Sequence, residues 1–118
     1  MSTTSERALK LIAGISTVGF LCLFSQLAGA QSEGERLVEE ARCYACHQLT
    51  EILLGPPYIA IAARHAPRKD VMVDVLARKI VSGGGGNWGV VPMVPNQWVT
   101  IEEARIMSEW ILGLADTQ

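Results

Sequence analysis

Apolar residues recur at helical spacing in four short stretches of this chain, and the segments between them are polar or rich in proline and glycine. The stretches that predict helices are residues 35–42, 58–65, 70–81 and 101–112. Pro67 ends the second and the run Gly83–Gly86 ends the third, because neither residue type continues a helix well. No strand-length alternation of apolar and polar residues stands out. The pattern therefore predicts an all-α fold of about four short helices.

The last of these helices begins with a recognisable signal. Thr100 and Glu103 form a capping box, in which each side chain satisfies a free backbone amide of the first turn. We expect its buried stripe to comprise Ala104, Met107, Trp110 and Ile111. The exposure of Ser108 is expected to vary, and Gly113 is expected just past the helix end, where glycine is favoured.

The first thirty residues follow a different pattern. A polar start with Arg7 and Lys10 precedes an apolar run over residues 11–27, and Ala28-Gly29-Ala30 then offers a small-residue cleavage site. This order is typical of a signal peptide, and the alternative is an uncleaved membrane anchor. We expect residues 1–30 to be a cleaved signal peptide and residues 31–118 to form one domain in the periplasm.

Composition then narrows the class of protein. The formal net charge of the 118 residues is −2, which argues against a nucleic-acid binder. Of three cysteines, one falls in the predicted signal peptide, and Cys43 and Cys46 remain. Domains as small as residues 31–118 often need a metal or a prosthetic group to complete their core.

The chemistry is concentrated at Cys43-Tyr44-Ala45-Cys46-His47, a C-x-x-C-H signature for covalent attachment of c-type haem. Two thiols at this spacing can reach the two vinyl groups of one haem edge, and the adjoining histidine can supply an axial nitrogen to the iron. A redox-active cysteine pair would need a βαβ context, a zinc site would need four separable ligands, and a disulfide would leave His47 unexplained.

Haem iron has a sixth position, which is either ligated or open. The candidates for it are His65, Met72, Met93 and Met107. Two of the methionines lie inside predicted helices, where they serve more often as core residues, and the histidine is interpreted as solvated at a helix end. Met93 lies on a loop between Pro92 and Pro95, which restrict the backbone around it. Ligation by His47 and Met93 would raise the reduction potential and leave no open site, which favours electron transfer over oxygen or peroxide chemistry.

These motifs give the chain a resemblance to the short bacterial class I cytochromes c, which donate electrons to periplasmic reductases such as nitrite reductase. The resemblance covers residues 33–115. It rests on four segments, namely Cys43–His47, Gly55-Pro56-Pro57-Tyr58, the run Trp88-Gly-x-x-Pro-Met-x-Pro-Asn96, and the last helix with Trp110. It implies a small class I cytochrome c fold, with helices wrapped around one covalently bound haem c.

The resemblance also implies a role for each matching residue. Cys43 and Cys46 would carry the thioethers, with His47 as the proximal iron ligand and Met93 as the distal one. The remaining expected haem contacts are Pro56, Lys79, Trp88 and Asn96.

Each of these four contacts has a distinct part. The carbonyl of Pro56 would accept the proton of the His47 ring, and the indole of Trp88 would donate to a haem propionate. Asn96 would hydrogen-bond near the methionine sulfur. Lys79 falls where the family has a propionate-binding arginine, and Arg78 is the neighbouring alternative.

Two expectations concern the surroundings of the haem. The first and last helices would cross with Val38 and Trp110 near the contact, although the family often has an aromatic residue at the first position. The glycine run 83–86 is interpreted as a flexible surface loop.

The function predicted from these residues is that of a soluble periplasmic electron carrier, a monomer and not an enzyme. It would transfer one electron at a time by an outer-sphere route. Periplasmic reductases, oxidases or dehydrogenases would dock on an apolar rim of Val90, Val91 and Val94, and neither nucleic acid nor a small-molecule substrate is expected. The alternatives are a haem-bearing subunit of a larger periplasmic oxidoreductase and a haem sensor or peroxidase-like enzyme.

Overall fold

The computed structural model describes residues 31–117, and the predicted signal peptide lies outside them. The elements, in chain order, are α1 (Glu33–Glu40), the short 3-10 helix η1 (Cys43–Ala45), α2 (Tyr58–His65), η2 (Ala66–Arg68), α3 (Lys69–Ser82), α4 (Ile101–Gly113) and η3 (Leu114–Thr117). Within residues 31–117 the only β-type pairing is an isolated antiparallel bridge between Gly84 and Met93. No helix of this part of the chain is both long enough and apolar enough to cross a membrane.

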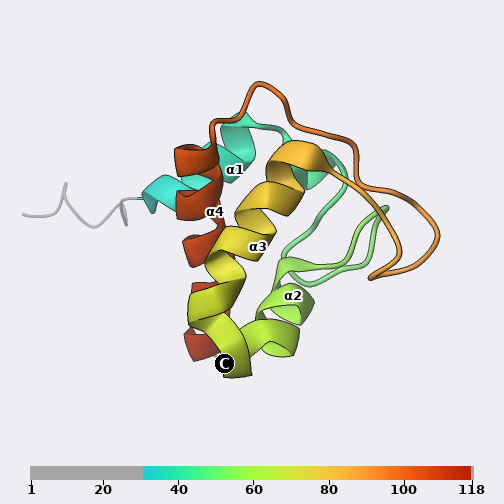
Figure 1. Ribbon diagram of the computed structural model, residues 1–118. Coiled ribbons are helices and arrows are strands. Elements are labelled where there is room, and N and C mark those ends of the chain that lie inside the picture. The colour runs from blue at the N-terminus through green and yellow to red at the C-terminus, as the bar shows by residue number, and fades with distance from the viewer. Residues whose placement is uncertain (1–30, 118) are drawn as a thin grey trace, which may run out of the picture. The chain divides into compact units, whose positions relative to one another are not determined.

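Helix α4 is the centre of the packing, because α1, α2 and α3 all contact it (Figure 1). The expected capping box is present: the Thr100 hydroxyl accepts from the Glu103 amide, and the Glu103 carboxylate accepts from the Thr100 amide. Its fully buried residues are Ala104, Met107, Ser108, Ile111 and Leu112, and Trp110 is half-buried. Ser108, whose exposure the apolar pattern left open, is thus buried. Its hydroxyl donates to the Ala104 carbonyl at 2.7 Å, which lets a polar side chain enter the core.

The prediction that Gly113 lies past the end of α4 is wrong. Gly113 is the last residue of the helix, and Leu114 keeps right-handed backbone angles as the chain continues into η3. A glycine is needed after a helix only where the backbone turns left-handed, and this helix end does not do so.

Helix α1 begins two residues earlier than predicted, because the Ser32 hydroxyl accepts from the Glu35 amide and caps it. It ends at Glu40, and Arg42 adopts left-handed backbone angles (φ 58°) that turn the chain into η1. The crossing of α1 over α4 is close at Gly34. A Cβ there would lie 2.3 Å from the Trp110 Cβ, so only glycine fits. Val38, the other expected contact residue, is fully buried in the same core.

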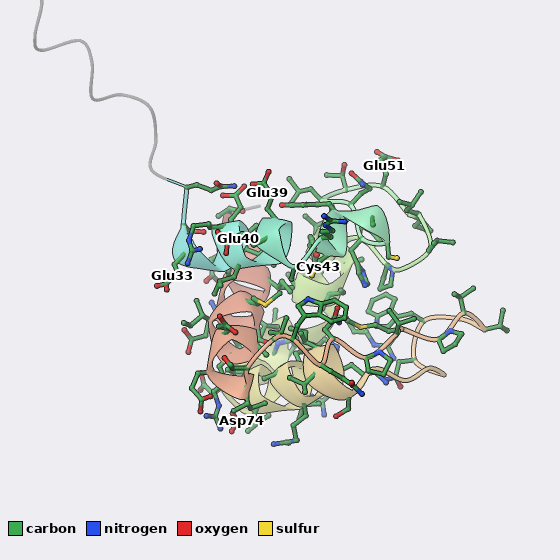
Figure 2. All side chains as sticks on the ribbon, turned by 90° about the horizontal axis from the view of Figure 1, so that it is seen from above. Glu33, Glu39, Glu40, Cys43, Glu51 and Asp74 are labelled. Carbon is green, nitrogen blue, oxygen red and sulfur yellow. The ribbon has the colours of Figure 1, made fainter. Side chains whose placement is uncertain are left out.

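Two loops complete the domain, one over residues 46–57 and one over residues 83–100. Both extend from the helices on the side away from α4, and the two perpendicular views agree on this (Figures 1 and 2). The first loop follows the C-x-x-C-H signature, and the second carries Met93. The fold thus brings both predicted ligand-bearing segments to one side of the domain.

Candidate functional site

The two cysteines of the signature lie in and just after η1, close to the end of α1 (Figure 2). Both are free thiols and both are half-buried. The Cys43 side chain packs against the hydrophobic core, and burial raises the pKa of its thiol. The two sulfurs, three residues apart, thus lie at the edge of the core.

The ring of His47 is oriented from its Nδ1 side. Nδ1 lies 2.8 Å from the Pro56 carbonyl oxygen, as the resemblance implied. A carbonyl oxygen only accepts, so Nδ1 carries the proton and Nε2 keeps the lone pair that a metal needs. The loop that brings Pro56 to the ring is closed by two backbone hydrogen bonds, from Gly55 to the Cys46 carbonyl and from Tyr58 to the Gln48 carbonyl.

Gly55 makes this approach possible. A Cβ at that position would lie 2.4 Å from His47 Cε1 and 2.7 Å from Nδ1, so any other residue would push the imidazole away. The residue stands in the Gly-Pro-Pro-Tyr motif, but its role depends on a contact eight residues away along the chain. The sequence contained the motif and could not reveal the contact.

Tyr58 also packs against the His47 ring. Its aromatic ring stacks on the His47 ring, with centroids 5.5 Å apart and planes 19° apart, and meets Tyr44 and Trp110 edge-on. Its buried hydroxyl lies beside the Cys43 thiol and has no oxygen or nitrogen partner among the described residues. Burial raises the pKa of this hydroxyl far above its usual range. Tyr58 therefore links the signature segment to α4 through Trp110.

The backbone of Met93 is held by the glycine run. The Gly84 amide donates to the Met93 carbonyl at 2.8 Å, and the Met93 amide donates to the Gly84 carbonyl at 3.0 Å. Gly83 has φ 68°, and a Cβ there would lie 2.4 Å from the Met93 carbonyl oxygen. The expectation of a merely flexible glycine loop is therefore incomplete, because at least its first two glycines fix the backbone of Met93, whose side chain packs against the core.

Asn96 anchors the other end of this loop to α3. Its side-chain amide donates to the Ile80 carbonyl at 2.9 Å and to the Val94 carbonyl at 3.4 Å, and its backbone amide also reaches the end of α3. The hydrogen bonds of this buried side chain thus go to carbonyls. The expected hydrogen bond near the Met93 sulfur is not among the contacts of the described residues.

Of the other two expected haem contacts, Lys79 lies beside the same loop and Trp88 lies within it. Lys79 is half-buried, and its Nζ would lie 3.0 Å from a Cβ on Gly84, which places the amine beside the glycine run. Trp88 is 42% exposed, and the guanidinium of Arg64 lies over its ring at 4.7 Å from the centroid.

The remaining candidates for an iron ligand lie elsewhere. Met72 and Met107 are buried in α3 and α4, as expected of core residues. His65 is half-buried, and its Nδ1 is enclosed without a partner among the described residues, so the histidine interpreted as solvated is only partly exposed. Burial, with Arg64 and Arg68 nearby, lowers its pKa.

Comparison with known proteins identifies the family. No protein-family model matches the chain. Cytochrome c-552 of Hydrogenobacter thermophilus is 47% identical over 88 residues, which make up 75% of this chain and 88% of that protein. The chain belongs to the bacterial class I cytochromes c.

Solved structures agree with this assignment. The crystal structure of cytochrome c552 from Nitrosomonas europaea has 39% sequence identity and a TM-score of 0.63, and the match covers 67% of this chain and 96% of that one. The class 1 cytochrome MtoD of Sideroxydans lithotrophicus shares the fold at 23% identity, with a TM-score of 0.57 over 70% of this chain and 92% of that one. The all-α cytochrome c fold predicted from the sequence is confirmed.

The cofactor of this family is covalent haem c, and the donors of this chain fit it. The spacing of Cys43 and Cys46 suits two thioether bonds to one haem edge. The protonated Nδ1 of His47 leaves Nε2 as a nitrogen donor, and Met93 offers a half-buried thioether on a fixed backbone. A nitrogen and a thioether sulfur are the donors that hold haem iron in the cytochromes c.

Proposed function

We propose that this protein is a soluble periplasmic electron carrier in which His47 and Met93 ligate the iron of haem c. The observation that carries the proposal is the pair of backbone hydrogen bonds between Gly84 and Met93, which hold a thioether in place without a helix behind it. A ligand held in this way favours a filled sixth position over one left open for a substrate. Bound haem supplies a one-electron couple that changes state without making or breaking a bond.

The residues of the chain tune that couple. The Pro56 carbonyl, by accepting from His47 Nδ1, fixes the ring and raises the basicity of Nε2. The Met93 thioether favours ferrous iron and raises the potential relative to a second histidine. Tyr58 and Gly55 lie against the histidine ring and limit its rotation, so little reorganisation accompanies electron transfer.

The surface of the Met93 loop supports docking of a redox partner. Val90, Val91 and Val94 are 97%, 58% and 66% exposed, so their side chains form no part of the core. The loop that follows His47 adds four more exposed apolar side chains, Leu49, Ile52, Leu53 and Leu54. Exposed apolar side chains gathered on two loops are typical of an interaction site, and redox encounters use small, weak interfaces.

The absorption spectrum of the oxidised protein tests the ligation. We expect low-spin ferric iron, a long-wavelength band from methionine-to-iron charge transfer, and no carbon monoxide binding by the reduced protein. The Met93→Ala variant should lose the band and bind carbon monoxide, whereas Met72→Leu, a change at a buried methionine of α3, should keep the band. High-spin ferric iron in the wild-type protein would instead favour a sensor or a peroxidase-like enzyme.

A charge on the rim tests the docking surface. Val91→Glu should slow electron transfer to the physiological partner, and Val71→Glu on α3 is the matched control because Val71 is 63% exposed and lies outside the loop. Equal rates for both variants and the wild-type protein would overturn the docking site. Hydrodynamic mass and co-purification separate the free carrier from a subunit of a larger oxidoreductase, which would run as a stable complex.

A further inference from the structure

The loop that carries Met93 is fastened at its base and has little support at its tip. The Gly84–Met93 bridge and the hydrogen bonds of Asn96 to α3 both lie at the base. Residues 85–92 between them are exposed except where they meet a single side chain from another element. Gly86 and Gly89 adopt positive φ values, and glycine backbone loses the most conformational freedom when it is ordered.

That side chain is Arg64, from the last turn of α2. Its Nη1 donates to the Asn87 carbonyl at 3.1 Å, and its Cζ lies 4.7 Å from the centroid of the Trp88 ring. Of the hydrogen bonds within residues 31–117, only the one from Arg64 to Asn87 joins residues 85–92 to a helix. The guanidinium has the geometry for both contacts at once, because its plane can cover an aromatic face while its edge donates to a carbonyl.

We propose that Arg64 is a positioning residue for Met93. It latches the tip of the loop to α2, and so limits the opening of the Gly84–Met93 bridge that would release the thioether. The inference rests on the proposed ligation by Met93 for its effect on the iron, but its effect on the loop does not depend on it. Both contacts are lost together when the tip moves away, so one side chain governs how often the loop opens.

Three variants separate the contacts of Arg64 from its charge. Arg64→Leu removes both contacts, and Arg64→Lys keeps a cation near the Trp88 ring while losing the planar donor edge. Arg68 lies four residues further on in η2 and is also exposed, and it makes no hydrogen bond among the described residues. Arg68→Leu is therefore the control for loss of one positive charge in this region.

The first measurement is hydrogen exchange of the Gly84 and Met93 amides in the holoprotein, which reports opening of the bridge whether or not Met93 binds iron. We expect Arg64→Leu to speed exchange by about tenfold, as loss of one weak stacking contact and one hydrogen bond implies. Arg64→Lys should give an intermediate value and Arg68→Leu none. Buried core amides of α4, such as that of Met107, should exchange at the wild-type rate in all three variants, because only the loop opens more often.

The second measurement is the rate at which imidazole displaces the sixth ligand of the ferric protein. Arg64→Leu should raise this rate by the same factor as the exchange of the Met93 amide. The latch is overturned if Arg64→Leu leaves bridge exchange unchanged, or if α4 exchange rises equally, which would mean a general loss of stability. If the wild-type protein lacks the methionine charge-transfer band while bridge exchange still responds to Arg64→Leu, the latch stands and the proposed ligation fails.

Discussion

Gly84 and Met93 exchange two backbone hydrogen bonds, so the position of the methionine depends on a residue nine places earlier in the chain. The glycine run that separates α3 from the loop lets the two backbone segments come this close. Gly83 has φ 68° and touches the Met93 carbonyl, whereas Gly86 has φ 89° and has open space where a Cβ would be. Both glycines have a positive φ, but they differ in their contact with Met93.

This difference predicts different absorption spectra for two alanine variants. Gly83→Ala and Gly86→Ala should each lose about 1–3 kcal/mol, because φ is positive at both positions. Only Gly83→Ala should also displace Met93, because its Cβ would meet the carbonyl oxygen at 2.4 Å. We therefore expect it alone to weaken the methionine charge-transfer band. Equal bands in the two variants would show that the bridge does not position the thioether.

The ring and the hydroxyl of Tyr58 should contribute differently to the free energy of unfolding. Tyr58→Phe keeps the stacking on His47 and removes a buried hydroxyl without an oxygen or nitrogen partner, so the free energy of unfolding should stay the same or rise slightly. Tyr58→Leu loses the stacking and the edge contacts to Tyr44 and Trp110, and should cost about 2–3 kcal/mol.

Denaturant unfolding and the paramagnetically shifted proton resonances of His47 check this prediction together. Tyr58→Phe should leave the His47 resonances close to those of the wild-type protein, and Tyr58→Leu should shift them. A large loss of stability in Tyr58→Phe would mean that the hydroxyl contributes more than the ring.

The crossing of α1 over α4 predicts the effect of adding one methyl group. Gly34→Ala should destabilise the fold by about 1–3 kcal/mol, because the new Cβ would overlap the Trp110 Cβ and the Ile106 carbonyl. Gly113→Ala is the matched control, since Gly113 is also helical and nothing lies within 4 Å of its Cβ position. That variant should gain up to about 1 kcal/mol from helix propensity. Thermal unfolding of both variants distinguishes overlap from propensity, and destabilisation by both would contradict the close crossing.

The capping box predicts a pH dependence. Hydrogen bonds from the Thr100 amide and hydroxyl lower the pKa of Glu103, so the folded pKa lies below the unfolded one. The stabilisation is then complete above the unfolded pKa of about 4.3, and it is lost as the pH falls through the pKa of the folded protein. Glu103→Gln should therefore differ most from the wild-type protein at neutral pH, and the difference should shrink in acid.

Urea unfolding at neutral pH and at about pH 3 measures this difference. Glu102→Gln is the control, because Glu102 stands in the same first turn but takes no part in the box. Thr100→Ala should cost about 1 kcal/mol through loss of the cap. A Glu103→Gln effect that does not change with pH, or that Glu102→Gln reproduces, would contradict the box as its source.

The helices could be predicted from the sequence because their signals are local. The helix over 58–65 has the predicted bounds, and α3 differs by one residue at each end. The earlier start of α1 also had a local signal, since Ser32 stands three residues before Glu35 and caps the helix. The burial of Ser108 could not be predicted, because it depends on a hydrogen bond that the apolar pattern does not contain.

The signature residues of the candidate site could be predicted from the sequence, but the residues that hold them in position could not. The C-x-x-C-H signature names Cys43, Cys46 and His47, and the resemblance named Pro56. Gly55, Tyr58 and Arg64 act through contacts between segments that only the fold brings together. A glycine is noticeable in a sequence, but whether it lies against a ring, a helix or a carbonyl is decided by packing over a longer range.

The Gly84–Met93 bridge has a consequence for how the protein could change its partners. The hydrogen bonds that hold the loop come from main-chain atoms and from the side chains of Arg64 and Asn96, and the side chains of Val90, Val91 and Val94 make none of them. The outer surface of the loop is therefore uncoupled from the holding of Met93. On the proposed docking surface, substitutions at the three valines should therefore alter which protein is recognised without changing the proposed ligation by Met93, so partner choice and reduction potential could evolve independently on the same loop.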